Sequence, residues 1–125
     1  PLVAVFDHHV PPQLEEDAPA ALPANAHVDV RLGLGATSSI VWEYLRAAGV
    51  ALDAHTASAL FCGVRYDTAD LSRNASALDE EAYYDCFRHA DRAALARIAH
   101  PPLPRGYYRE LKRALGLARA HGPLV

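Results

Sequence analysis

A short apolar run over residues 2–6 ends abruptly in an acid and two histidines: Asp7, His8 and His9. The run is rich in valine, which is typical of a strand that is covered on both faces in a parallel sheet. Ligands of open α/β sheets bind at the carboxyl ends of the strands. The three polar residues therefore predict a binding site at the end of this strand.

Helical patterns dominate the rest of the chain. Residues 10–26 hold four prolines and predict a loop, and residues 27–32 alternate weakly, which predicts a second short strand. Five helices are expected from apolar faces within residues 40–48, 57–64, 82–90, 95–98 and 107–115. Strands come first and helices follow, so the expected fold class is α/β, with parallel-sheet strands followed mostly by helices.

Capping residues mark the ends of several of these helices. Hydroxyl residues at positions 37–39 offer an N-cap for the first helix, and Gly49 stands where a glycine would end it. Asp53 is placed to cap the second helix. Ser76 and Asp79 have the spacing of a capping box at the start of the third.

The composition narrows the class of protein. The chain has 125 residues, which suit one small domain, and a net charge of -3 calls for neither a nucleic acid nor a membrane partner. No apolar run is long enough to span a membrane and no signal peptide precedes Pro1, so a cytoplasmic protein is expected. Cys62 and Cys86 stand among apolar residues of helical patterns and are predicted to be core residues. Basic residues predominate after Asp85, either as solvated helix faces or as a field that attracts a phosphorylated substrate.

A metal site is one interpretation of the residues at the end of the first strand. Imidazole and carboxylate groups are suitable ligands for zinc, manganese or iron. Adjacent side chains at a strand end point to opposite sides, or splay once the strand breaks. His8 and His9 are therefore expected to have different roles, one at a metal and one at a substrate. The alternative is a pair of surface histidines with no ligand.

Two further segments carry polar residues at helix ends. In FCGVRYDTADLSRNAS, residues 61–76, Asp67 follows an apolar helical face, and a buried carboxylate must be paired or bound to metal. The alternative is that Asp67 caps a helix or a turn. GATSS, residues 35–39, either presents free backbone N–H groups to an anion or is an ordinary N-cap.

These motifs together resemble the DHH phosphoesterase superfamily: DHH at a strand end, GATSS about thirty residues later, and then GVRYDT. The resemblance is closest to the branch of oligoribonucleases, phosphoadenosine phosphatases and cyclic dinucleotide phosphodiesterases. In that branch a helix that ends in G-I/V-x-x-D-T precedes an arginine-bearing segment, here LSRNAS. The resemblance extends to about Ala90 and implies that residues 1–125 are the C-terminal part of a DHH-type catalytic domain. An earlier H-x-x-x-D-x-D motif, a lone aspartate and a C-terminal substrate-binding domain are expected to lie outside a chain that is a piece of a longer protein.

The resemblance also implies a mechanism and a set of residues. The family hydrolyses phosphoesters with two divalent metals, usually Mn²⁺, with Mg²⁺ or Co²⁺ as alternatives. His8 would bind one metal ion and Asp67 would contact the metals. His9 would act on the scissile phosphate as a catalytic residue, with Asp7 supporting the histidines. The substrate phosphate would be bound by Arg65, Arg73, Ser38 and Ser39.

The expected substrates are short oligonucleotides, nucleoside bisphosphates or cyclic dinucleotides. An inorganic pyrophosphatase of the same superfamily is a rival prediction, against which the LSRNAS segment argues. A non-catalytic DHH-like module that binds a nucleotide or a protein is another. Because the chain would hold only part of a two-metal site, we expect it to be inactive alone. Exposed apolar edges of an incomplete sheet also make a homo-oligomer an expectation.

Overall fold

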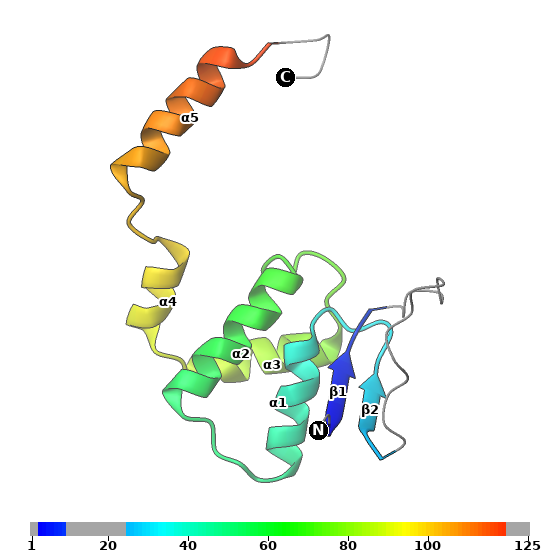
Figure 1. Cartoon of the computed structure of the whole chain (residues 1–125). Coiled ribbons are helices and arrows are strands. Elements are labelled where there is room, and N and C mark those ends of the chain that lie inside the picture. Colours follow the sequence, from blue (N-terminus) through cyan, green and yellow to red (C-terminus); the bar gives the residue numbers. More distant parts are fainter. Residues whose placement is uncertain (1–2, 10–24, 120–125) are drawn as a thin grey trace, which may run out of the picture. The chain divides into compact units, whose positions relative to one another are not determined.

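The computed structural model describes residues 3–9 and 25–119 (Figure 1). The predicted loop over residues 10–26 therefore lies mostly outside the described residues. The chain forms two compact units, residues 1–95 and residues 96–125. The described elements, in chain order, are β1 (Ala4–Asp7), β2 (His27–Val30), α1 (Thr37–Ala47), α2 (Ala54–Asp67), α3 (Ala77–His89), α4 (Arg92–Ala99) and α5 (Arg105–Leu117). Two strands followed by five helices confirm a mixed α/β fold for this part of the chain.

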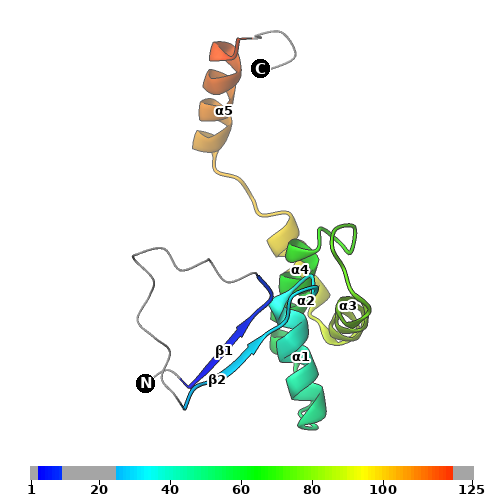
Figure 2. The same cartoon turned by 90° about the vertical axis from the view of Figure 1, so that its right-hand side faces the viewer.

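The two strands form a parallel sheet whose carboxyl ends lie side by side. Ala4 pairs with His27 and Asp7 pairs with Val30. The expectation that β1 is covered on both faces is wrong for the described residues, because all four of its residues are only partly buried. Helix α1 packs against β1, while α2 and α3 pack on α1 and on each other (Figures 1 and 2). Helix α1 is thus the helix that lies against the sheet, and α2 and α3 lie beyond it.

Local capping chemistry sets most of the helix boundaries as expected. Gly49 has a positive φ of 67°, and its N–H and that of Val50 are bonded to carbonyl groups of the last turn of α1. The Asp53 carboxylate accepts the Thr56 N–H at 2.7 Å and caps α2. Ser76 and Asp79 form the capping box of α3. These three predictions are confirmed because each depends on residues within a few positions of one another.

The start of α1 differs from the expectation. The N-cap residue is Ala36, which has no side-chain oxygen, and the hydroxyl residues at 37–39 lie inside the first turn. The prediction of a hydroxyl N-cap is therefore wrong. The Asp79 carboxylate of α3 instead accepts the N–H groups of Gly35 and Ala36, directly before the helix.

The core of the first unit lies between α1, α2 and α3. Trp42 is 2% exposed and Val64 is fully buried, and the other buried apolar residues are Ala36, Ile40, Ala57, Leu60, Phe61, Ala82, Cys86 and Leu95. Cys86 is a free thiol whose pKa is raised to about 12, chiefly by burial. Cys62 is a partly buried thiol that packs against the same core, also with a raised pKa from burial. The prediction that both cysteines are core residues is confirmed.

Gly63 lets α1 and α2 approach closely, which gives a first testable prediction. A Cβ at Gly63 would lie 1.9 Å from Ser38 Oγ and 2.9 Å from Ser38 Cβ. Gly63→Ala should therefore force the helices apart and lower the free energy of unfolding by about 2 kcal/mol. Gly116→Ala in α5 is the matched control, since no atom of the described residues lies within 4 Å of its added Cβ. Urea unfolding that shows equal stability for both variants would contradict the prediction.

The last two helices follow the predicted pattern. Helix α5 begins directly after Pro104, which occupies the N-cap position rather than the first helical one. Its apolar residues, among them Tyr107 and Leu111, share one stripe of the helix, and basic residues occupy much of the rest. Across the described residues, every helix is too short or too polar to cross a bilayer.

Candidate functional site

Asp7 organises the backbone and one histidine at the end of β1. Its Oδ1 accepts the N–H of His8 at 2.7 Å and that of His9 at 3.3 Å, and lies 2.8 Å from His9 Nδ1. The pKa of the Asp7 carboxyl is lowered, first by the His9 side chain and then by the two backbone N–H groups. The carboxylate is therefore ionised at neutral pH and holds the His9 ring in place.

The two histidine rings lie together, not on opposite sides. Their centroids are 4.0 Å apart with an interplanar angle of 38°. The expectation that they point apart is wrong, because β1 ends at Asp7 and strand alternation does not continue beyond it. Ligand atoms of Asp7, His8 and His9 lie within 4.8 Å of one another, close enough to bind one metal ion.

His8 and His9 line an open pocket of about 810 Å³ in the first unit. This volume is within the range of small-ligand sites. Asp67 and Arg73 line the same pocket, although they are about sixty residues away from the histidines in sequence. The rest of the lining consists of Gly33, Leu34, Gly35, Asn74 and Ala75. The fold thus brings together four of the residues that the sequence singled out.

Asp67 is the last residue of α2 and its side chain is exposed. The inference that a buried carboxylate stands at this position is therefore wrong. The C-terminal end of a helix carries partial negative charge, which makes a carboxylate unfavourable there unless a cation lies near it. Arg73 supplies one cation nearby, because its Nη2 donates to the Asp67 backbone carbonyl at 3.0 Å.

A strained turn carries Arg73 and Asn74 to the pocket. Ala69, Asp70, Leu71 and Asn74 have φ values of 48°, 56°, 63° and 52°, in the left-handed region that disfavours non-glycine residues. Such residues persist only where their surroundings hold them, and they occur often at functional sites. The sequence did not reveal this turn, because it contains no glycine.

Arg65 holds that turn from outside the pocket. Its guanidinium donates to the Asp70 carboxylate at 2.9 Å and 3.2 Å, and the Tyr83 hydroxyl donates to the same carboxylate at 3.0 Å. The Asp70 contact also raises the pKa of Arg65. The structure therefore places Arg65 in an ion pair and not among the residues that line the pocket.

Ser38 and Ser39 also lie away from the pocket lining. Ser38 contacts Gly63 across the helix crossing, where a Cβ on the glycine would meet its hydroxyl. Ser39 is fully buried and its hydroxyl donates to Asp79 at 2.5 Å. Both hydroxyls thus contact the protein itself. In this segment the pocket is lined by residues 33–35, and this part of the lining ends two residues before α1.

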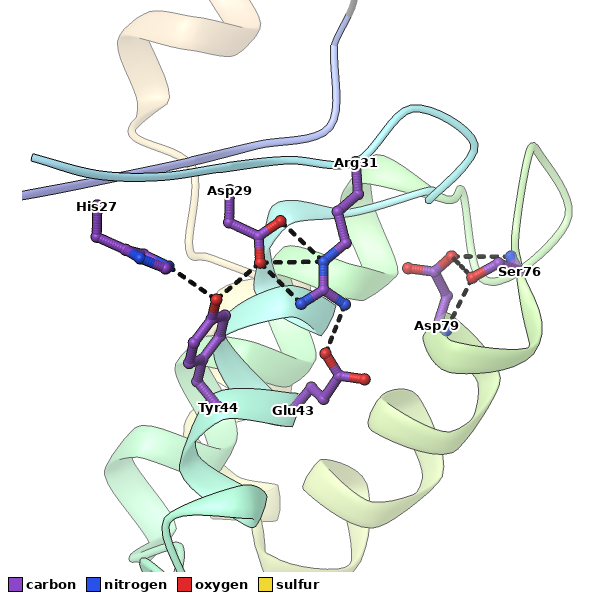
Figure 3. Close-up of polar contacts among 7 residues, drawn as sticks. All are labelled: His27, Asp29, Arg31, Glu43, Tyr44, Ser76 and Asp79. Carbon is purple, nitrogen blue, oxygen red and sulfur yellow. Dashed lines mark hydrogen bonds and ion pairs between the residues drawn. The ribbon is translucent and has the colours of Figure 1, made fainter. Parts of the chain in front are cut away.

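Asp79 fills the anion position that GATSS suggested at the start of α1. Its buried carboxylate accepts the N–H of Gly35 at 2.8 Å and that of Ala36 at 3.1 Å, besides the Ser39 hydroxyl. It also accepts the Ser76 N–H at 2.8 Å and the Ser76 hydroxyl at 2.6 Å (Figure 3). Burial alone would raise the pKa of Asp79, but these hydrogen bonds outweigh it and the pKa is lowered. The N–H groups of Gly35 and Ala36, directly before α1, therefore bind the protein's own carboxylate.

A second polar network joins β2 to α1 (Figure 3). The Arg31 guanidinium donates to Asp29 at 2.7–3.0 Å and to Glu43 at 2.5 Å. The Tyr44 hydroxyl donates to Asp29 at 2.9 Å and lies 2.8 Å from His27 Nε2. These contacts lower the pKa of Asp29, chiefly through Arg31, and fix the sheet on α1. The residues of this network lie outside the pocket lining, and they support the pocket by holding β2 on α1.

No protein-family model matches the chain. The chain is similar to the uncharacterized protein MJ1633 of Methanocaldococcus jannaschii, with 35% identity over 77 residues. The match covers 62% of this chain and 16% of that protein, so the chain spans about a sixth of the length of this relative.

Proposed function

We propose that this chain is part of a metal-dependent phosphoesterase of the DHH superfamily. Its substrates are short oligonucleotides, nucleoside bisphosphates or cyclic dinucleotides. The observation that carries the proposal is the shared pocket of His8, His9, Asp67 and Arg73. Two imidazoles, a carboxylate and a guanidinium from distant segments form a site with groups for both a metal and a phosphate.

The donor set fits a divalent metal. The ligand atoms of Asp7, His8 and His9 lie close together, and Asp67 lines the same pocket. Asp67 stands at the negative end of α2, where a cation would offset an unfavourable charge. Manganese accepts this mixture of imidazole and carboxylate ligands, and Mg²⁺ and Co²⁺ are alternatives. Such an ion, when bound, supplies Lewis-acid stabilisation for phosphoester hydrolysis.

Each residue of the pocket then has a distinct role. His8 and Asp67 hold the metal. His9, whose Nδ1 lies 2.8 Å from the Asp7 carboxylate, is held toward the scissile phosphate and stabilises its charge. Arg73 binds a substrate phosphate with its guanidinium. Arg65, Ser38 and Ser39 act on the substrate only through the backbone that they support, since they lie outside the pocket lining.

The decisive experiment is a hydrolysis assay with Mn²⁺ in the full-length natural protein. The substrates are a short RNA oligomer, a nucleoside bisphosphate, a cyclic dinucleotide and pyrophosphate. His8→Ala should lower the turnover of one nucleotide substrate by at least about 100-fold, because it removes a metal ligand. His55→Ala, at an exposed position of α2 outside the pocket, is the matched control and should leave turnover unchanged.

The other outcomes separate the rival functions. Turnover of pyrophosphate alone would identify an inorganic pyrophosphatase. Nucleotide binding without hydrolysis of any of the four substrates would identify a non-catalytic binding module. Equal turnover by residues 1–125 alone and by the full-length protein would contradict the expectation that this chain holds an incomplete two-metal site.

A further inference from the structure

We propose that Thr37 is a positioning residue whose hydroxyl bonds Nδ1 of His8, fixes the orientation of the ring and leaves Nε2 as the ligand atom. The carrying observation is a distance of 2.8 Å between His8 Nδ1 and Thr37 Oγ1, across 29 residues of sequence. The statement that Nε2 binds a metal rests on the function proposed above. The contact between Thr37 and His8 does not depend on that function.

The position of Thr37 makes it a rigid partner for the ring. It is the first residue of α1, and the two residues before it donate their N–H groups to the buried Asp79 carboxylate. The start of this helix is therefore fixed to α3 by hydrogen bonds. A ring held by a side chain on such an element keeps its orientation, which a ligand residue requires.

The chemistry of imidazole limits what this contact does. In a neutral imidazole one nitrogen carries a proton and the other has a free lone pair. When the His8 Nδ1–H donates to the Thr37 hydroxyl oxygen, the lone pair is on Nε2. His8 and Thr37 are both partly buried, so water competes only in part for this hydrogen bond.

The neighbouring histidine has a different partner. His9 Nδ1 lies 2.8 Å from the charged Asp7 carboxylate, whereas His8 Nδ1 lies beside a neutral hydroxyl. The two adjacent histidines therefore differ through their hydrogen-bond partners, which is the physical basis for a ligand role at His8 and a phosphate-facing role at His9.

Histidine ¹⁵N NMR of the metal-free protein tests the tautomer directly. The wild-type protein should show one predominant tautomer for His8, because the Thr37 hydroxyl bonds Nδ1. Thr37→Val removes the hydroxyl with little change in shape and should give a mixture of the two His8 tautomers. Thr37→Ser keeps the hydroxyl and should restore the wild-type signals. An unchanged His8 spectrum in Thr37→Val would overturn the proposal.

Calorimetric titration with Mn²⁺ tests the consequence for binding. Thr37→Val should weaken Mn²⁺ affinity by about 10- to 100-fold, and Thr37→Ser should recover it. Thr56→Val removes a hydroxyl from the first turn of α2, where its partner is Asp53, and should have no effect. An altered tautomer with unchanged Mn²⁺ affinity would overturn the positioning role. No Mn²⁺ binding by the wild-type protein, with the tautomer response intact, would overturn the metal site and support the control of the His8 ring by Thr37.

Discussion

Asp79→Asn should lower the free energy of unfolding by about 3 kcal/mol or more, because it removes the buried negative charge to which several donors are hydrogen-bonded. The fully buried Asp79 carboxylate accepts hydrogen bonds from two backbone N–H groups at the start of α1, from Ser39 and from Ser76. Asparagine has almost the same shape, but its amide group turns one acceptor into a donor that faces other donors. At least one buried N–H or hydroxyl then loses its partner.

Asp53→Asn is the matched control for this prediction. Asp53 also caps a helix start by accepting a backbone N–H, but its side chain is exposed. Asparagine is as good an N-cap as aspartate, so this variant should unfold nearly as the wild type does. Trp42 is the single tryptophan and lies in the core between α1 and α3, so its fluorescence in urea reports on the relevant unit. Equal losses in the two variants would show that Asp79 acts as an ordinary cap.

The pH dependence of this effect has a defined sign. The folded-state pKa of Asp79 is lowered, so the carboxylate contributes its full stability above the unfolded-state pKa, at about pH 4. That contribution is lost as the pH falls through the folded-state pKa. The stability difference between the wild type and Asp79→Asn should therefore be constant near neutral pH and shrink below about pH 4.

Features that depend on neighbouring residues were predictable from the sequence. The five helical patterns, the glycine that ends α1 and the caps at Asp53 and Ser76 depend on periodicity or on contacts within one turn. The placement of a polar motif at the carboxyl end of β1 was predictable for the same reason. Each of these features leaves a local signal in the residue types.

Features that depend on distant contacts were not predictable. Asp79 matched a capping box, and nothing in the local spacing indicates that it also binds Gly35, 44 residues earlier. The left-handed turn after α2 contains no glycine, so no residue type marks it. The exposure of Asp67 and the side-by-side rings of His8 and His9 depend on where α2 and β1 end. A helix end carries an uncertainty of one or two residues, which is enough to reverse these inferences.

Gly35→Ala should destabilise the first unit by about 3 kcal/mol, at the upper end of the range for overpacking. An added Cβ would lie 2.6 Å from Thr68 Cγ2, 2.9 Å from the Asn74 carbonyl oxygen and 3.1 Å from Asp79 Oδ2. None of these groups moves easily. Thr68 and Asp79 are fully buried, and the Asn74 oxygen belongs to the backbone of the strained turn. The backbone of Gly35 itself does not need a positive φ, so the loss comes from space alone.

Gly33→Ala separates this effect from backbone strain in the same loop. Gly33 has a φ of 96°, and no atom of the described part of the chain lies within 4 Å of an added Cβ, so alanine there is unfavourable only through its backbone.

Thr68→Ser provides the second comparison. It deletes the nearest methyl group but keeps the hydroxyl that donates to the Val64 carbonyl and accepts the Leu71 N–H. Combined with Gly35→Ala, it should recover at least about 1 kcal/mol relative to the sum of the single variants.

A double-mutant cycle of Gly35→Ala and Asp79→Asn tests whether the two residues stabilise the pocket through one shared hydrogen bond. The Gly35 N–H donates to Asp79 Oδ2, so a shift at either residue breaks the same hydrogen bond. The loss of unfolding free energy in the double variant should therefore be smaller than the sum of the losses in the two single variants, by about 1 kcal/mol or more. Because Gly35 and Asn74 both line the pocket, the shift should also weaken Mn²⁺ binding in Gly35→Ala protein that is still folded. Additive losses in urea, with unchanged Mn²⁺ affinity, would show that Gly35 and Asp79 act independently of each other and of the pocket.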